Sequence, residues 1–152
     1  MSTFDTRILQ IAIVVNDLES KERAWSELLG QEPSKRVITD TVDKTGTVYN
    51  GESTPARLKA VVFDLGECIL ELMEPLGEPS VWSEHLNERG EGLHHIGFEV
   101  KGMDEAVKSV EALGIHPVQR AEYTNPYEKG RYVYFRSEEQ LGAMIEFNEL
   151  DD

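Results

Sequence analysis

Gly92-Leu93-His94-His95-Ile96-Gly97-Phe98-Glu99-Val100 is predicted to form a β-strand that carries polar side chains suited to catalysis or binding on one face. Because side chains alternate along a strand, His95, Gly97 and Glu99 share one face, and His94 lies on the other with Ile96, Phe98 and Val100. His95 is therefore the first candidate for a functional site. The alternative is that both histidines are ordinary residues at the start of a strand, without a functional role. The pattern of the rest of the chain distinguishes these interpretations.

The same pattern occurs a second time near the start of the chain. Leu9-Gln10-Ile11-Ala12-Ile13-Val14-Val15 matches residues 94–100 in pattern, with Gln10 opposite His95. Each half continues with a helical pattern that ends at Leu-Gly, and each half closes on a strand with a central glutamate, Glu71 or Glu146. We interpret this as the duplication of a βαβββ unit, with chance similarity between two α/β halves as the alternative.

The duplication predicts an α+β fold, in which two βαβββ modules pair into a curved mixed β-sheet cleft with helices outside. At 152 residues the chain has the length of a single domain. We expect an N-terminal module over residues 7–78, a linker helix over 79–89 and a C-terminal module over 90–150. Ser80 is expected to cap the linker helix together with Glu84. A polar loop is expected over residues 45–55.

Composition and charge exclude several classes of partner. Lys and Arg total 15 against 29 Asp and Glu, a net charge of -14, which argues against nucleic acid or an anionic membrane surface. No apolar run approaches the roughly 18 residues that a membrane span needs. The single cysteine can form no intrachain disulfide, which fits a reducing compartment. We therefore expect a soluble cytoplasmic protein with a small-molecule substrate.

The duplication also selects four polar residues at equivalent strand positions: Gln10 and His95 on the first strands, and Glu71 and Glu146 on the last. A buried glutamate costs several kcal/mol unless it is paired or bound to metal, and two glutamates in one cleft repel each other. One imidazole, two carboxylates and one amide oxygen suit a divalent cation, namely Zn, Co, Ni, Mn or Fe. Two solvent-facing glutamates beside a hydrogen-bonded Gln and His are the alternative.

At this point the chain resembles the vicinal oxygen chelate superfamily, which contains glyoxalase I, methylmalonyl-CoA epimerase, extradiol dioxygenases and bleomycin-resistance proteins. The resemblance covers nearly the whole chain. Residues 71–77, 80–89 and 90–100 are most similar to methylmalonyl-CoA epimerases. The resemblance implies a metal-dependent enzyme with Gln10, Glu71, His95 and Glu146 as metal ligands.

Two departures weaken the likeness to the epimerases. Such epimerases have a histidine where Gln10 stands, although the set of glutamine, glutamate, histidine and glutamate matches the zinc site of eukaryotic glyoxalase I. The segment Asn125 to Phe135 is also longer than the epimerase version. The metal prediction survives both departures, whereas the choice of substrate stays open.

A site of this kind supports proton removal next to a metal-bound carbonyl, with stabilisation of the resulting enolate. Glu146 is our first choice for the base and Glu71 the second. We favour an isomerase or lyase like methylmalonyl-CoA epimerase. A glyoxalase I-like lyase on a glutathione hemithioacetal is an alternative, and a metal-free binding or resistance protein is another. An extradiol dioxygenase fits less well, because Gln10 breaks its triad of two histidines and one carboxylate.

An acyl-CoA thioester would need cations and polar groups around the cleft. The candidates for substrate binding are Glu99, Lys59, Arg131, Tyr132 and Tyr134. An ordinary solvated charge is the alternative for each cation, and a packed core role is the alternative for each tyrosine. Exposed sheet edges in this architecture often pair, so we expect a homodimer.

Overall fold

A curved sheet of ten strands organises the chain in the computed structural model, which describes residues 5–152. The strand order is β2-β5-β6-β1-β7-β10-β9-β8-β3-β4. In chain order the elements are β1 (Ile8–Val14), α1 (Leu18–Leu29), β2 (Lys35–Ile38), α2 (Val42–Thr45), β3 (Val48–Tyr49), β4 (Glu52–Ser53), β5 (Arg57–Asp64), β6 (Ile69–Leu76), α3 (Val81–Arg89), β7 (Gly92–Glu99), α4 (Met103–Glu111), β8 (His116–Tyr123), β9 (Gly130–Arg136), α5 (Glu138–Leu141) and β10 (Met144–Leu150). The predicted α+β fold is confirmed.

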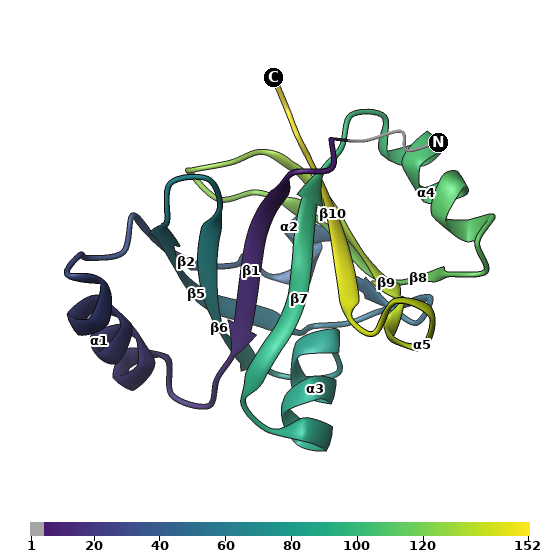
Figure 1. Ribbon diagram of the computed structural model, residues 1–152. Coiled ribbons are helices and arrows are strands. Elements are labelled where there is room, and N and C mark those ends of the chain that lie inside the picture. The colour runs from purple at the N-terminus through teal and green to yellow at the C-terminus, as the bar shows by residue number, and fades with distance from the viewer. Residues whose placement is uncertain (1–4) are drawn as a thin grey trace.

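The two halves meet at the centre of the sheet. β1 and β7 pair antiparallel, while β6 runs parallel to β1 and β10 runs parallel to β7. Figure 1 shows these central strands with the remaining strands of each half curving away on either side. The sheet is therefore mixed and curved, as the sequence predicted, and the inner faces of both halves look toward a common interior.

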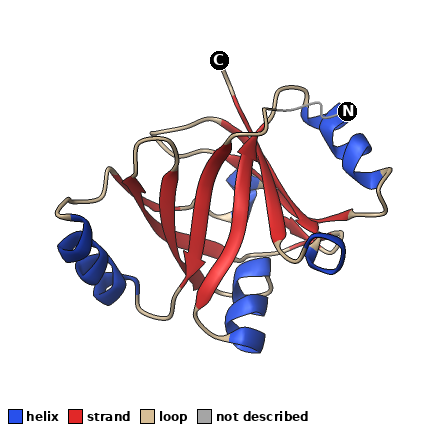
Figure 2. Ribbon diagram, viewed as in Figure 1, coloured by secondary structure: helices blue, strands red, loops and turns tan. Residues whose placement is uncertain are grey.

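Strand alternation separates the inside of the curved sheet from its outside. In β1 the side chains of Gln10, Ala12 and Val14 are buried, whereas the intervening Ile11 and Ile13 are partly buried and pack on the outer side with α1. A second outer core joins α4 to β9 and β10. Figure 2 shows α1 and α4 outside the strands on opposite flanks. No helix among residues 5–152 combines the length and the apolar character needed to cross a membrane.

The segment between β2 and β5 differs from the loop that the sequence predicted. Residues 42–53 form α2 and the small β3–β4 hairpin, and β3 pairs with β8, which belongs to the other half. The hairpin turns at Asn50-Gly51, where both residues have positive φ, as the tightest hairpin turns require. The segment thus crosses from one edge of the sheet to the other, and it contributes Thr45 and Thr47 to the wall of the interior.

Helix α3 connects the halves and closes one end of the interior. Ser80 caps it as predicted, but the side chain that accepts from the Ser80 backbone N–H in return is Ser83, not Glu84. Ser83 stands at the third helical position, whose side chain reaches the cap backbone. Glu84 instead forms an ion pair with Arg136 at 2.9 Å. The capped first turn places Trp82 in the interior, where it packs with Tyr132 and Tyr134.

Candidate active site

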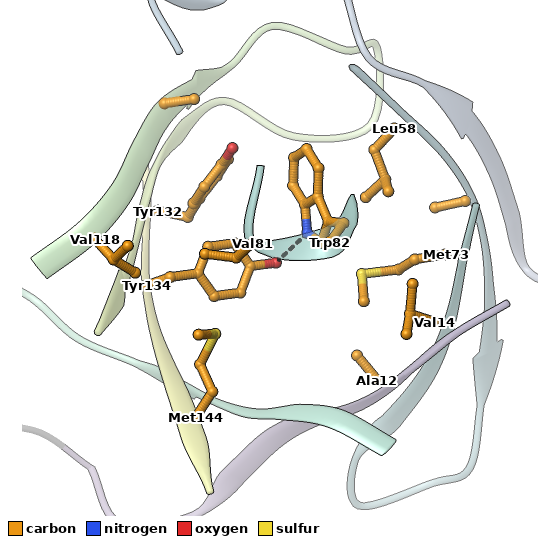
Figure 3. Packing of buried hydrophobic residues seen from close by; sticks show 12 residues of the cluster. Ala12, Val14, Leu58, Met73, Val81, Trp82, Val118, Tyr132, Tyr134 and Met144 are labelled. Atoms are coloured by element: carbon orange, nitrogen blue, oxygen red, sulfur yellow. Dashed lines mark hydrogen bonds between the residues drawn. The ribbon is translucent and has the colours of Figure 1, made fainter. Parts of the chain in front are cut away.

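The inner faces of both halves surround a cavity lined by apolar and aromatic side chains together with polar and acidic ones. Figure 3 shows the buried hydrophobic cluster of this interior, whose members Leu58, Trp82, Tyr132 and Tyr134 also line the cavity, and the hydrogen bond between Trp82 and Tyr134. The cavity has a volume of about 60 Å³, which is room for about four to six water molecules. It can therefore admit the reacting part of a small molecule, while a bulky remainder has to extend outside.

Three of the four predicted ligands meet at the floor of this cavity, where Glu146 lines it and Gln10 and His95 contact Glu146 from behind. His95 itself lines a neighbouring cavity. Gln10 Nε2 lies 2.9 Å from His95 Nε2 and donates a hydrogen bond to Glu146 Oε1. His95 Nε2 lies 3.3 Å from the same carboxylate oxygen. All three side chains are buried, with Gln10 the most exposed at 7%. The register explains the meeting, because Gln10 and Glu146 both lie opposite Gly97 on the strands that flank β7.

Two further polar residues extend the network along β10 to the cavity wall. Asn148 Nδ2 donates to Glu146 Oε1 at 3.0 Å, and the hydroxyl of Tyr123 donates to Asn148 Oδ1. Burial raises the pKa of the Tyr123 phenol well above its usual value, as does the nearby carboxylate of Glu146. Tyr123 therefore stays protonated as a donor. Sequence reasoning missed both residues, because Asn148, two positions after Glu146, and Tyr123, the last residue of β8, belong to no distinctive motif.

His94 extends the network in the opposite direction, toward α3. Its Nδ1 lies 2.8 Å from His95 Nδ1, and its Nε2 lies 3.0 Å from the carbonyl oxygen of Val81. Burial lowers the pKa of the His94 imidazole well below its usual value, and the neighbouring His95 adds to the effect. The sequence placed His94 on the face opposite His95, but a register shift between β1 and β7 lies at this point, and the two imidazoles are in contact.

Glu71, the fourth predicted ligand, faces the same cavity but stands apart from the other three. It lies on β6 and lines the cavity together with Glu146. Within the described part of the chain no hydrogen bond holds its carboxylate. Desolvation raises the pKa of Glu71 to about 8, and the negative charge of Glu146 contributes to the rise. Glu71 and Glu146 therefore disfavour each other's negative charge in the metal-free protein, as expected from the sequence.

The raised pKa of Glu71 predicts a pH-dependent effect of Glu71→Gln on chelator-treated protein. The folded pKa of about 8 lies above the ordinary value of 4.5, so the wild-type fold loses stability as pH rises from about 4.5 to 8. Glutamine escapes this loss. We expect Glu71→Gln to raise the free energy of unfolding by about 1–3 kcal/mol at pH 9 and by little at pH 4.5. Urea denaturation at both pH values measures the difference.

Glu67→Gln is the matched control for this prediction, because Glu67 is an exposed glutamate in the turn between β5 and β6. It should change stability little at either pH. An equal gain for Glu71→Gln at pH 4.5 and pH 9 would contradict the assigned pKa, since the effect would then come from packing.

The donor set at the cavity floor is suited to a divalent cation. His95 Nε2 and Glu146 Oε1 both point at the amide nitrogen of Gln10, so an electron pair from each converges on one position. An imidazole nitrogen and carboxylate or amide oxygens are the ligands that transition metals and zinc accept. Among residues 5–152, however, no three His, Cys, Asp or Glu side chains gather within reach of one ion. The four-ligand site therefore stays a prediction, in which Glu71 has to approach the other three.

Gly97 is a site residue that the sequence analysis placed on the correct face but did not select. A Cβ atom there would lie 2.6 Å from Gln10 Cγ and 3.0 Å from Gln10 Nε2. Real Cβ atoms do not approach other atoms so closely, so glycine is needed for Gln10 to lie across β7 and reach Glu146. The glycine in the interior of the strand was the available signal, because such glycines often mark a close approach of another group.

The predicted substrate-binding residues divide into two groups. Tyr132 and Tyr134 line the cavity, and their hydroxyls accept hydrogen bonds from Gln119 and Trp82. Lys59, Arg131 and Glu99 do not line it. Lys59 alternates with the inward-facing Leu58 and Ala60 and so points outward. Arg131 binds Glu149 at 3.1 Å on the outer surface, and Glu99 is half-buried beside Asn148 at the end of β7.

A cation that sequence reasoning missed does lie at the cavity. Lys35, at the start of β2, lines the cavity, and its ammonium lies 5.9 Å from the centre of the Tyr127 ring. Its positive charge also lowers the pKa of Glu71, against the larger raising effect of burial. The position of Lys35 depends on the curvature of the sheet, which brings β2 toward the segment after β8, and no local motif reports that curvature.

Comparisons with known proteins agree with this architecture. The family model described as the Glyoxalase/Bleomycin resistance protein/Dioxygenase superfamily matches residues 9–135. A methylmalonyl-CoA epimerase from Mycobacterium tuberculosis has a TM-score of 0.70 at 20% identity, over 100% of this chain and 92% of that one. A Streptomyces coelicolor methylmalonyl-CoA epimerase variant has a TM-score of 0.68 at 22% identity, over 95% and 96%. A hypothetical protein from Bacillus halodurans has a TM-score of 0.70 at 22% identity, over 96% and 95%. Among curated proteins no match is found.

Proposed function

We propose that this chain, which belongs to the glyoxalase/bleomycin resistance protein/dioxygenase superfamily, is a divalent-metal-dependent isomerase or lyase that removes a proton next to a carbonyl. The proposal is carried by the convergence of His95 Nε2 and Glu146 Oε1 on the Gln10 amide, at the floor of a cavity that Glu71 also faces. An acyl-CoA thioester is the proposed substrate class. It is supported by the fold shared with a methylmalonyl-CoA epimerase that was solved in complex with methylmalonyl-CoA.

In this proposal the metal is held by Gln10, Glu71, His95 and Glu146, with Gln10 contributing its amide oxygen. A bound divalent cation supplies Lewis acidity, which polarises the substrate carbonyl and stabilises the negative charge that develops on its oxygen. The buried surroundings of His95 and Glu146 strengthen such electrostatic interactions, because little water competes there.

Two carboxylates are available to move the proton, and they differ in how many hydrogen bonds hold them. Glu146 is fixed by hydrogen bonds from Gln10 and Asn148, whereas Glu71 faces the cavity without such a restraint. We therefore assign proton removal to Glu71 first and Glu146 second, the reverse of the order that the sequence favoured. In an epimerase the second carboxylate returns the proton to the opposite face of the carbon.

The remaining cavity residues orient the substrate and exclude water. Trp82, Tyr132 and Tyr134 supply a mostly apolar wall around the reacting carbon. Lys35 offers a positive charge at the cavity that suits a carboxylate or phosphate of the substrate. The homodimer expected from the sequence stays a prediction.

Proton exchange in deuterium oxide tests this proposal. Chelator-treated protein is reloaded with Zn²⁺, Co²⁺, Ni²⁺ or Mn²⁺ and incubated with methylmalonyl-CoA, and in a second series with the glutathione hemithioacetal of methylglyoxal. We expect metal-dependent deuterium incorporation with one of the two, and mass spectrometry detects it. Incorporation into methylmalonyl-CoA would identify the epimerase-like reaction, and incorporation into the lactoyl product would identify the lyase. Protein that binds metal and exchanges neither substrate would contradict the proposal.

A metal-free binding protein is the second candidate, and one observation favours it. The Gln10 amide nitrogen occupies the position on which the His95 and Glu146 lone pairs converge, so the network is complete without an ion. The aromatic cavity would then bind a small apolar molecule. Equilibrium dialysis of the chelator-treated protein against Zn²⁺ and Co²⁺ separates the two candidates, because a binding protein of this kind would take up neither ion.

A further inference from the structure

We infer that His94 is a positioning residue: it fixes the tautomer of His95, so that the lone pair of His95 Nε2 faces Gln10 and Glu146. Each hydrogen along this chain of hydrogen bonds can be assigned, because the group at each end can act only as a donor or only as an acceptor. A backbone carbonyl can only accept, and an amide nitrogen can only donate. The two ends can therefore be analysed independently and compared.

The first end is the carbonyl of Val81, which lies just inside α3. His94 Nε2 is 3.0 Å from this oxygen, so Nε2 carries the hydrogen and donates. A neutral imidazole has a single N–H group, which leaves a lone pair on His94 Nδ1. That atom lies 2.8 Å from His95 Nδ1. His95 Nδ1 must then carry the hydrogen, and His95 Nε2 must carry the lone pair.

The second end is the side-chain amide of Gln10. Its nitrogen donates one hydrogen to the Glu146 carboxylate and lies 2.9 Å from His95 Nε2. The second amide hydrogen needs an acceptor there, so His95 Nε2 has to present its lone pair. This assignment agrees with the one obtained from Val81. If His94 carried a second hydrogen, on Nδ1, it would donate to His95 Nδ1, and His95 would carry its hydrogen on Nε2. The Nε2–H group of His95 and the amide N–H of Gln10 would then be two donors facing each other.

Burial makes the assignment exclusive. His94 is 5% exposed and His95 is 3% exposed, so neither ring can exchange its partner for bulk water. If the acceptor at residue 94 were lost, the Nδ1–H group of His95 would be buried without a partner. The alternative tautomer, with hydrogen on Nε2, would then compete and would direct a proton toward the position where we propose the metal. Mutation of the hydrogen-bond partner of a metal-binding histidine typically lowers metal affinity by about 10- to 100-fold.

Nitrogen-15 NMR of histidine-labelled, metal-free protein tests the tautomers directly, because imidazole nitrogens with and without hydrogen have distinct shifts. In the wild type we expect His94 to be protonated at Nε2 and His95 at Nδ1. In His94→Phe, which keeps a ring but has no acceptor, a His95 population with hydrogen on Nε2 should appear. In His94→Asn, whose side-chain oxygen can stand in for Nδ1, the wild-type His95 tautomer should return. Backbone amide spectra establish that each variant is folded.

A wild-type His95 that carries its hydrogen on Nε2 would overturn the inference, as would a folded His94→Phe that keeps the wild-type tautomer. Zinc titration adds a second readout, for which we expect about 10- to 100-fold weaker binding by His94→Phe than by His94→Asn. This consequence for affinity rests on the proposed function, whereas the tautomer assignment does not. If the wild type shows the expected tautomers but binds no metal, the proposed function fails and the role of His94 stands.

Discussion

Gly97→Ala should remove most of the proton-exchange activity, by about 100-fold or more, although it adds a single methyl group. The new Cβ atom would lie 2.6 Å from Gln10 Cγ, so the glutamine side chain has to leave its position across β7. Its hydrogen bonds to His95 and Glu146 are lost with it. Displacements of about 1 Å in a catalytic constellation cost about 100-fold in rate. The deuterium-incorporation rate of the metal-loaded variant measures the effect.

A double-mutant cycle separates this clash from a general weakening of the strand. Gly97→Ala should lower the free energy of unfolding by about 1–3 kcal/mol, because it overpacks a buried position. Gln10→Ala removes the atom that the new methyl group meets, so Gly97→Ala should cost little in that background. An equal loss of stability in both backgrounds would show that Gln10 is not what makes glycine necessary at this position.

Glu146→Gln should reduce proton exchange by about 100- to 10,000-fold, the usual size of a lost acid or base contribution. The substitution removes the negative charge but keeps an oxygen, which can still accept from Gln10 and Asn148. The free energy of unfolding should therefore change by no more than about 1 kcal/mol. Exchange rates and urea denaturation of the same preparation measure both quantities, so that a loss of activity cannot be attributed to unfolding.

Glu122→Gln provides the matched control for Glu146→Gln, since Glu122 is an exposed glutamate at the same cavity. It should keep wild-type exchange, because a solvated charge there contributes little. Full activity of Glu146→Gln would remove Glu146 from the site, and equal losses in both variants would indicate a general effect of cavity charge.

The fold was predictable because its main elements carry strong local signals. β1 alternates in the expected way, and α1 is capped by Asp17 and Gly30 with the geometries that these residues favour. The β3–β4 hairpin was missed, although Asn50-Gly51 is a strong hairpin signal, because its two-residue strands are too short to show alternation. Its pairing with β8 is a long-range contact, which no local pattern reports.

The site was predictable in part because duplication relates distant residues. It selected Gln10, His95 and Glu146, which the structure brings into contact, and Glu71, which faces the same cavity. Their role as metal ligands stays a prediction, as does the duplication itself. Alternation alone could not place Lys59 and Arg131, because a residue's face depends on which neighbours turn inward. The role of His94 escaped notice because a register shift, invisible in sequence, turns its ring toward His95.

Metal titration of the chelator-treated protein tests the central claim most directly. The account predicts that the wild type binds one Zn²⁺ or Co²⁺ ion per chain, and that His95→Phe binds it at least about 100-fold more weakly, because an essential ligand is lost. His116→Phe, which alters an exposed histidine at the start of β8, should bind as the wild type does. Absence of binding by the folded wild type, or equal affinity in His95→Phe, would contradict a metal centre at the floor of this cavity.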